Sequence, residues 1–257
     1  LNRMVRNIRV QYGLKDRYYQ GLIRSYQYLT YIRKIFSDMN LPSELSYLPH
    51  VESSFNYRAY SKVGAAGIWQ FMRSTGRLYN LKINYVVDER RDVFKSTKSA
   101  ARFLRDNYKL LNSWPLALTA YNHGPRSLVR AKKKLKTDDI NVIVEKYKGR
   151  RFKFASKNFY ATFMATVEIS RDPSKYFPDF KRPAEFKISK LPLDRPYTVH
   201  QLIKSLNIKK NTLKIYNPSI RSSVFRSSLY LPKGFVLHVP KTGNKGLKLY
   251  KTKLASI

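Results

Sequence analysis

The chain has 257 residues and a mass of 30.2 kDa, enough for one large domain or for a medium-sized domain with a small companion. With 43% hydrophobic residues it can bury a sizeable core, which excludes a fully disordered chain. Its 51 Lys and Arg against 16 Asp and Glu give a net charge of +35, which predicts attraction to polyanions such as nucleic acid, anionic lipid or a cell wall. The lack of cysteine excludes disulfides and thiolate chemistry, and only four histidines argue against a zinc site.

The sequence contains no stretch of about 18 apolar residues, so we expect no transmembrane segment. It begins at Leu1 without an initiator methionine, from which we expect that an upstream portion was trimmed; a signal peptide could have stood there. A chain without cysteine is compatible with either redox compartment.

Apolar residues recur at steps of three and four along most of the first 170 residues, which is typical of amphipathic helices. The pattern predicts helices over residues 18–39, 42–53, 99–111, 115–122, 138–147 and 156–170. Pro42 suits a first helical turn, where its missing N–H is harmless, and an acidic cap precedes Ile140. The glycines of the stretch SKVGAAG, residues 61–67, favour tight turns. No convincing strand occurs before Arg171.

Five prolines between Pro173 and Pro196 interrupt the helical pattern, so we expect a linker or a wrapping arm there. The following residues predict a strand at 197–199, helices at 202–206 and 211–216, and a strand at 236–240. About 45 residues bury only a thin core, so this unit should pack on the first domain or fold marginally. The basic stretch from Lys241 should be loosely ordered unless it is docked.

The most informative stretch is LPSELSYLPHVESSFNYRAYSKVGAAGIWQFM, residues 41–72, together with Ala-Tyr-Asn at 120–122. A Glu-Ser pair, a Ser three residues before a Gly-Ala-x-Gly turn, a Trp-Gln-Phe-Met run and the downstream Ala-Tyr-Asn occur in one order. This order resembles glycoside hydrolase family 23, specifically its lytic transglycosylases with the SLT or goose-lysozyme-like fold, over residues 18–180. The unit at 197–240 resembles a LysM module, a binder of N-acetylglucosamine-containing glycans, although the usual Gly-Asp-Thr-Leu after its first strand is missing.

The resemblance implies a mainly α architecture, with a lysozyme-like (SLT) domain followed by a small α+β (βααβ) LysM-like domain. We expect the catalytic domain with its N-terminal helix at residues 1–180, a linker at 181–193, the LysM-like domain at 194–240 and a basic tail at 241–257.

Glu52 is the candidate catalytic acid. Glycosidic bond cleavage needs a proton on the leaving oxygen, and a carboxyl in an apolar setting keeps its proton because burial raises its pKa. The side chains that could build this setting are Phe55, Trp69, Phe71 and Tyr121. A second carboxylate is not evident, because Glu44 would point about 80° away from Glu52 on an ideal helix. Only a cation in direct contact would lower the pKa of Glu52, and we expect neither Arg58 nor Lys62 to touch it.

The resemblance assigns further residues to the site. Glu52 would protonate the bridge oxygen and then accept the proton of the muramoyl C6 hydroxyl, which attacks its own ring and leaves a 1,6-anhydro sugar. The remaining assignments are Ser61 near the acid, Gln70 and Met72 along the sugar subsites, and Tyr121 with Asn122 orienting the sugar and the acid.

Structural roles are the alternatives for the same residues. Gln70 could be a capped polar residue, Met72 a core filler, and Tyr121 a core residue with its hydroxyl satisfied. We assign His123 to the surface rather than to catalysis.

One position departs from the family. Where relatives carry an acid in a Glu-Thr-x-x-Tyr stretch, this chain has Ala155 followed by Ser-Lys-Asn-Phe. We therefore consider a modified glycan, for example one lacking N-acetyl groups, as a possible substrate.

The resulting expectation is an enzyme that cleaves the β-1,4 bond between N-acetylmuramic acid and N-acetylglucosamine in peptidoglycan, without metal or cofactor. It would lie outside the bacterial cytoplasm, in the periplasm or cell envelope or secreted, as a monomer held on anionic wall components by its basic surface. A hydrolytic muramidase of the same family is the nearest alternative, and a non-catalytic wall or polyanion binder is the next. We expect no specific nucleic-acid partner, because Lys132 to Lys134 share a helix with Leu128 and Leu135 and fit a solvated face.

Overall fold

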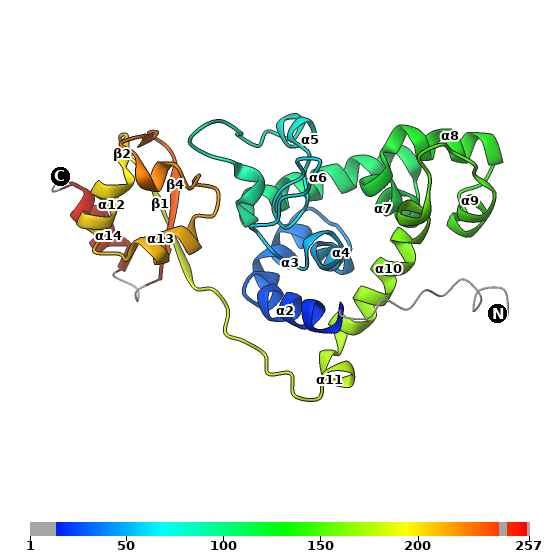
Figure 1. The fold of residues 1–257 in the computed structure, drawn as a ribbon, viewed down its shortest axis with the longest axis horizontal. Coiled ribbons are helices and arrows are strands. Elements are labelled where there is room, and N and C mark those ends of the chain that lie inside the picture. Colours follow the sequence, from blue (N-terminus) through cyan, green and yellow to red (C-terminus); the bar gives the residue numbers. More distant parts are fainter. Residues whose placement is uncertain (1–13, 242–245, 256–257) are drawn as a thin grey trace.

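The computed structural model describes residues 14–241 and 246–255. These residues form a helical first domain and a smaller second unit that contains the strands, connected by an extended segment (Figure 1). No helix within these residues is both long enough and apolar enough to cross a bilayer.

Helices account for the regular structure of the first domain. Its elements are α2 (Leu14–Tyr26), α3 (Leu29–Ser37), η1 (Ser43–Tyr47), α4 (Leu48–Ser53), α5 (Arg73–Leu78), η2 (Glu89–Arg91), α6 (Val93–Leu111), α7 (Trp114–His123), α8 (Pro125–Leu135), α9 (Ile140–Lys146), α10 (Phe154–Arg171) and α11 (Pro173–Tyr176). The long helix α6 begins at Asp92, whose carboxylate accepts hydrogen bonds from the first free backbone N–H groups. The mainly α architecture is therefore confirmed.

Two of the predicted helices are divided in the structure. The helix expected at 18–39 breaks between α2 and α3, because the backbone N–H groups of Gln27 and Tyr28 bond three residues back instead of four. The helix expected at 42–53 begins as a 3-10 segment and becomes α-helical only at Leu48. Pro49, which has no N–H to donate, occupies the first turn of α4.

The first domain packs around two apolar clusters. The larger one includes Phe36, Trp69 and Leu104, each fully buried, and lies between α3, α6, α7 and α10. A smaller cluster joins α7, α8 and α9 through residues such as Leu128 and Ile143. Consequently α7, with its almost uniformly apolar surface, lies between both clusters, as its sequence predicted.

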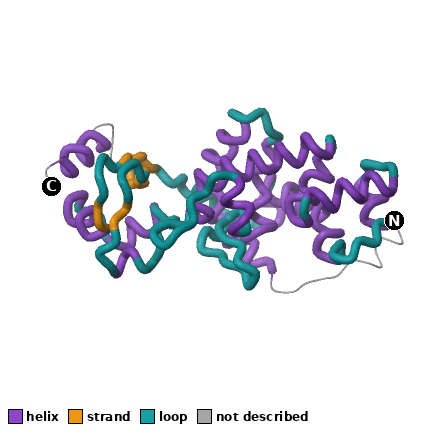
Figure 2. The backbone as a smooth tube through the Cα atoms, turned by 90° about the horizontal axis from the view of Figure 1, so that it is seen from above, coloured by secondary structure: helices purple, strands orange, loops and turns teal. Residues whose placement is uncertain are grey.

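The second unit contains two small antiparallel sheets and three helices. Its elements are β1 (Ile188–Pro192), β2 (Tyr197–Thr198), α12 (Val199–Leu206), α13 (Lys210–Tyr216), η3 (Val224–Arg226), β3 (Tyr230–Leu231), β4 (Val236–Pro240) and α14 (Gly246–Ala255). The two predicted strands do not pair with each other: β1 pairs with β4, and β2 pairs with β3. Figure 2 shows the strands of this unit with helices beside them.

Two boundaries differ from the sequence-based division. Residues 188–192, expected in the linker, form β1 and belong to the second unit, because Leu191 enters its core. The basic stretch after Lys241 contains α14, whose Tyr250 and Leu254 are buried in the same core. The condition of docking is thus met for residues 246–255, while 242–245 and 256–257 lie outside the described residues.

The connecting segment follows the first domain as an arm. Aromatic side chains of the segment, Phe177 and Phe180, pack on Tyr19 and Tyr26 of α2. Further along, the N–H of Phe186 donates to the carbonyl of Gln27.

A loop of the first domain completes the core of the second unit. Val86 and Val87, which precede η2, are buried in the apolar cluster of the second unit, and Val87 forms a bridge with Ile220. The backbone N–H of Asp88 donates to the carbonyl of Ser219. The second unit therefore packs on the first domain, which supplements its thin core.

Candidate active site

The candidate acid Glu52 lies in the last turn of α4. The helix ends there because Ser54 and Phe55 adopt left-handed backbone conformations, with φ of 50° and 56°. The hydroxyl of Ser53 donates to the carbonyl of Ile68, 2.9 Å away. This bond ties the end of α4 to the loop that carries Trp69 and Gln70 and fixes the position of Glu52 relative to it.

The electrostatic state of Glu52 is set by burial. The residue is half-buried, and burial raises the pKa of its carboxyl to about 8. Among residues 14–241 and 246–255, none forms an ion pair or a hydrogen bond with this carboxyl; Arg58 and Lys62 are exposed. The carboxyl therefore holds its proton at neutral pH and has that proton free to donate.

Tyr121 is the predicted site residue whose hydroxyl feels the charge of the acid. Its hydroxyl donates to the carbonyl of Trp69, 2.7 Å away, and its ring packs against Phe71 and Phe103. Burial raises the pKa of this hydroxyl well above its usual value, and the negative charge of Glu52 raises it further. Tyr121 is therefore within electrostatic reach of Glu52 and remains a neutral donor.

Four of the predicted site residues line one cavity of about 250 Å³. They are Gln70, Met72, Tyr121 and Asn122, and the other lining residues are Phe71, Thr75, Phe103, His123, Gly124 and Pro125. Met72 is 41% exposed, which rules out a core-filling role. Sequence reasoning missed the contribution of Phe103 and of residues 123–125; their position directly after Ala-Tyr-Asn was the available signal for the latter.

The loop below this cavity depends on one glycine. Gly67 has φ of 79°, and a Cβ there would lie 1.9 Å from the carbonyl oxygen of Arg90, so only glycine fits. The same turn holds Gln70 at φ of 47°, and its side-chain amide donates to the carbonyl of Gly67 over 2.8 Å. The conformation of Gln70, costly for a residue with a side chain, is thus fixed by its own amide.

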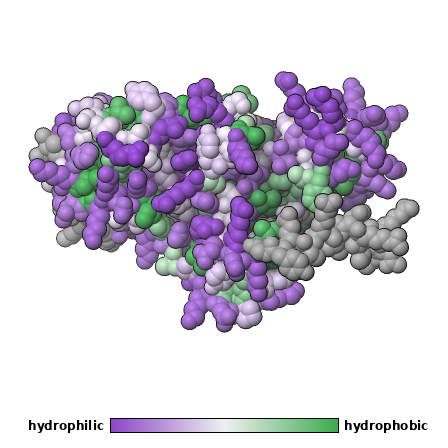
Figure 3. Space-filling view, viewed as in Figure 1, coloured by the Kyte–Doolittle hydropathy of each residue, from purple (hydrophilic) through white to green (hydrophobic). Residues whose placement is uncertain are grey.

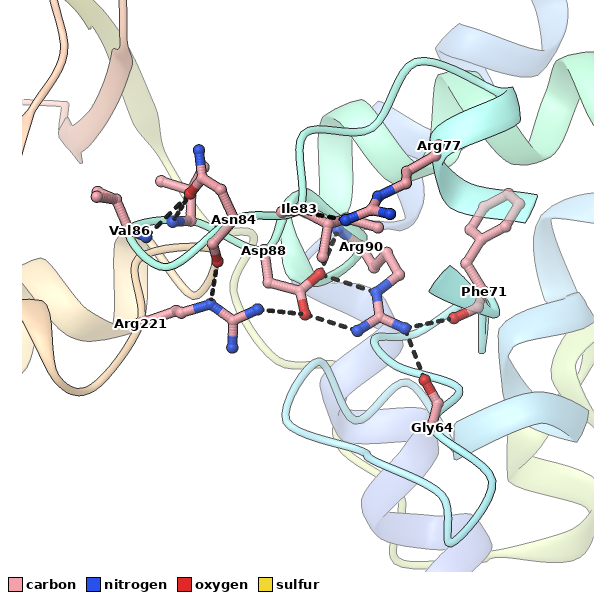
Figure 4. A network of polar contacts seen from close by, with 10 residues as sticks. Gly64, Phe71, Arg77, Ile83, Asn84, Val86, Asp88, Arg90 and Arg221 are labelled. Atoms are coloured by element: carbon pink, nitrogen blue, oxygen red, sulfur yellow. Dashed lines mark hydrogen bonds and ion pairs between the residues drawn. The ribbon is translucent and has the colours of Figure 1, made fainter. Parts of the chain in front are cut away.

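A buried arginine braces the loop from behind (Figure 4). The guanidinium of Arg90 donates to the carbonyls of Gly64 and Phe71 at 2.6 and 3.0 Å, and to both oxygens of Asp88 at 2.9 and 2.7 Å. Arg221 of the second unit lies 3.6 Å from the same carboxylate. Burial acts to raise the pKa of Asp88, but its bonds with Arg90 outweigh burial and lower it. The second unit is thereby linked through one carboxylate to the loop of the cavity.

The remaining predicted residues have local partners. Ser61 accepts a hydrogen bond from the N–H of Ala65 within its own loop and is not among the residues that line the cavity. The side-chain oxygen of Asn122 accepts a bond from Ser156 of α10 at 3.2 Å. The two ring nitrogens of His123 form hydrogen bonds with the hydroxyls of Ser156 and Ser127. Burial, followed by the charge of Arg130, lowers the pKa of His123. These contacts hold the rim of the cavity in place.

Other carboxylates are not available as partners for Glu52. Within the described ranges three carboxylates are fully buried, and each has a partner. Asp88 pairs with Arg90, Glu89 forms an ion pair with Lys95, and Asp92 caps α6. Glu44 is bound to Arg171 on the surface. No group of three or more His, Asp or Glu that could hold a metal ion occurs in this part of the chain.

Comparisons with known proteins find similar sequences. Residues 31–144 match the family model described as "Transglycosylase SLT domain". Membrane-bound lytic murein transglycosylase D of Escherichia coli K12 is 29% identical over 208 residues, which cover 80% of this chain and 45% of that protein. A putative tributyltin chloride resistance protein of Alteromonas sp. strain M-1 is 36% identical over 109 residues, covering 42% of this chain and 53% of the relative.

Among solved structures, an inactive mutant of lytic transglycosylase Slt from Pseudomonas aeruginosa aligns with 59% of this chain and 24% of its own, at 18% identity and a TM-score of 0.46. The chain spans less than half of the length of the E. coli relative that it matches. Residues 31–144 thus match the model of the transglycosylase SLT domain, and the chain is similar in sequence to a lytic murein transglycosylase.

Proposed function

We propose that the protein is a peptidoglycan lytic transglycosylase that cleaves the β-1,4 bond between N-acetylmuramic acid and N-acetylglucosamine. The single observation that carries this proposal is the carboxyl of Glu52. Its pKa of about 8 keeps it protonated at neutral pH, and it has no described partner. Glu52 does not itself line the cavity of Gln70, Met72 and Tyr121, but its charge raises the pKa of Tyr121 in the cavity wall. A carboxyl of this kind is suited to donate a proton to a glycosidic oxygen near neutral pH.

The proposed reaction needs one catalytic side chain. Glu52 gives its proton to the bridge oxygen while the bond from this oxygen to the muramoyl C1 breaks. The carboxylate then accepts the proton of the C6 hydroxyl as its oxygen bonds to C1, so Glu52 ends protonated and no water is consumed. Tyr121, whose hydroxyl holds the Trp69 carbonyl, keeps the Gln70 loop against the acid.

The engagement of the other buried carboxylates supports a mechanism with one acid. Most glycosidases use a second carboxylate to shelter the cationic centre, but substrate-assisted families are exceptions. Here the buried Asp88, Glu89 and Asp92 all serve the fold. The N-acetyl group of the muramoyl residue is the remaining candidate for that role.

The site of action follows from the substrate. Peptidoglycan lies outside the cytoplasm, so we place the protein in the periplasm or cell envelope of a bacterium, or outside the cell. The net charge of +35 would concentrate it on wall carboxylates and phosphates, which raises the local concentration of substrate. Whether the second unit, residues 188–240 with α14, binds glycan as a LysM-like module stays a prediction.

Product analysis tests the proposal. Purified sacculi are digested with the protein and with Glu52→Gln, and the released muropeptides are weighed by mass spectrometry. We expect anhydro ends, lighter by one water than reducing ends, from the unmodified protein and almost none from the variant. Reducing ends that also depend on Glu52 would favour a hydrolytic muramidase, and binding to sacculi without released sugars would favour a wall-binding protein.

The substituent on the sugar is a separate question. Ala155, where relatives carry an acid, is exposed in the first turn of α10, while the neighbouring Ser156 contacts Asn122 at the cavity. We keep as an alternative the prediction that a modified glycan, for example one lacking N-acetyl groups, is the preferred substrate, in which case the muramoyl N-acetyl group would not supply the shelter described above. Equal or faster turnover of acetylated sacculi would count against it.

A further inference from the structure

Next to the active-site cavity lies a second hollow whose walls are strongly basic. It has a volume of about 550 Å³, and Arg126, Arg130, Arg150 and Arg151 are the charged residues that line it, beside Tyr147. A further hollow of about 460 Å³ shares Arg130 and Tyr147 with it and adds Lys133, Lys134 and Lys148. We call the two together the α8–α9 basic pocket. Figure 3 shows the surface over α8 and α9 as hydrophilic.

The α8–α9 basic pocket adjoins the cavity that Gln70 and Tyr121 line. His123, Gly124 and Pro125 line both the basic hollow and the cavity with Gln70 and Tyr121. The wall between the two is therefore the turn that joins α7 to α8. A ligand in one hollow and a ligand in the other would therefore contact opposite sides of the same turn.

The cations of this pocket are not neutralised by the protein. Neither hollow has an acidic residue in its lining. Within the described part of the chain the arginines at 126, 130, 150 and 151 and the lysines at 133, 134 and 148 form no ion pair, whereas the neighbouring Lys132 pairs with Asp138. Uncompensated cations around one concave surface repel one another, so their arrangement favours an anionic ligand.

Guanidinium groups select for the chemistry of that ligand. The planar fork of arginine matches carboxylate and phosphate groups with two parallel hydrogen bonds. A pocket of 300 to 1,000 Å³, in round figures, holds a ligand the size of a short peptide. On a peptidoglycan strand the anionic groups of this size are the stem peptides, which are attached to the muramoyl lactyl group and end in carboxylates.

We infer that the α8–α9 basic pocket binds the carboxylates of the stem peptide carried by a muramoyl residue next to the bond that is cleaved. This inference rests on the proposed function. The inference adds a substrate preference to the proposed function, because the protein would then prefer glycan strands that still carry their stem peptides over strands from which amidases have removed the peptides. The sequence analysis assigned Lys132 to Lys134 together to a solvated face. In the structure Lys132 forms an ion pair with Asp138, whereas Lys133 and Lys134 line the pocket.

Binding, measured separately from turnover, tests the inference. The full chain with Glu52→Gln, which stops cleavage, is titrated by calorimetry with a soluble glycan fragment that carries stem peptides and with the same fragment after enzymatic removal of the peptides. One exposed guanidinium–carboxylate contact gives up to about fivefold in affinity, so two such contacts predict up to about 25-fold tighter binding of the peptide-bearing fragment at low salt. The preference should shrink as salt is added, because exposed charges are screened.

Matched variants locate the effect. Arg130→Gln with Arg150→Gln, added to the same background, should abolish the preference and change the affinity for the peptide-free fragment less than about twofold. Both side chains are exposed, so the fold is expected to persist, and a thermal melt checks this. The control is Arg226→Gln, an exposed arginine of the second unit, which should leave both affinities unchanged.

Four outcomes overturn the inference. Equal affinity for the two fragments would sink it and leave the proposed function standing. A double variant that weakens both fragments alike would mean that the pocket attracts the strand as a whole, and tighter binding of a phosphodiester wall polymer than of either fragment would identify a different occupant. Binding of neither fragment would count against the proposed function as well.

Discussion

Replacing the candidate acid should stabilise the protein in a manner that depends on pH. In the folded state the carboxyl of Glu52 has a pKa of about 8, raised by burial from 4.5. The folded protein therefore binds this proton more tightly than the unfolded chain does. The contribution of the Glu52 carboxyl to the free energy of unfolding is therefore complete below pH 4.5 and is lost as the pH rises through 8. Glu52→Gln, which resembles the protonated acid but does not titrate, should thus gain stability over the unmodified protein as the pH rises.

The expected magnitude follows from the shift. Each unit of pKa difference corresponds to about 1.4 kcal/mol, so the ionisation of Glu52 costs under about 1 kcal/mol at pH 5 and about 4 kcal/mol at pH 8. The advantage of Glu52→Gln in free energy of unfolding should therefore grow by about 3 kcal/mol between these two pH values, with water entry lowering this figure.

Urea unfolding at pH 5, 6, 7 and 8 measures this difference. Glu44→Gln is the control of opposite sign, because the pKa of Glu44 is lowered by a hydrogen bond from its own backbone N–H and by Arg171. Its stabilising contribution is present above its unfolded pKa and lost as the pH falls. Glu44→Gln should therefore cost up to about 1 kcal/mol at pH 7 and little at pH 3. A constant difference between Glu52→Gln and the unmodified protein from pH 5 to 8 would refute the burial argument.

Three other predictions concern activity and the cavity loop. The rate constant kcat/KM should fall above about pH 8 as Glu52 loses its proton, in a pH–rate profile on soluble glycan; a fall already complete at pH 5 would contradict this. Gly67→Ala should lower the free energy of unfolding, measured in urea, by more than about 3 kcal/mol, because the new Cβ meets a backbone carbonyl. The control Gly124→Ala is also at positive φ but faces open space, so it should cost about 1 kcal/mol. Equal costs would argue against the clash. Arg221→Gln removes one partner of Asp88, so proteolysis of the segment between the two units should be faster and glycan turnover severalfold slower, while the first domain keeps its fold. Unchanged rates of proteolysis and turnover would mean that this ion pair does not stabilise the contact between the units.

Some features of the site could be read without a structure. The order of Glu52, the glycine turn, Gln70 and Tyr121 along the chain was enough to predict the family resemblance, and the match of residues 31–144 to the SLT domain agrees with it. The role of Glu52 as the acid stays a prediction. The helices of the first domain were also predictable where an apolar stripe and a cap coincide, as at α9 with Asp139. Such signals are local, because a helix satisfies its own backbone hydrogen bonds within a few residues.

Other features depend on contacts between distant residues. The strands at 188–192 and 236–240 pair across a separation that no local pattern specifies, and the sequence analysis placed the first of them in a linker. The burial that raises the pKa of Glu52 and the shared use of Asp88 by Arg90 and Arg221 arise only when separate segments meet. The sequence alone determined which side chains were available for acid catalysis and for binding anions. Tertiary structure decided which carboxyl is kept dry and which cations surround one hollow, because desolvation and charge repulsion depend on distances in space and not on spacing along the chain.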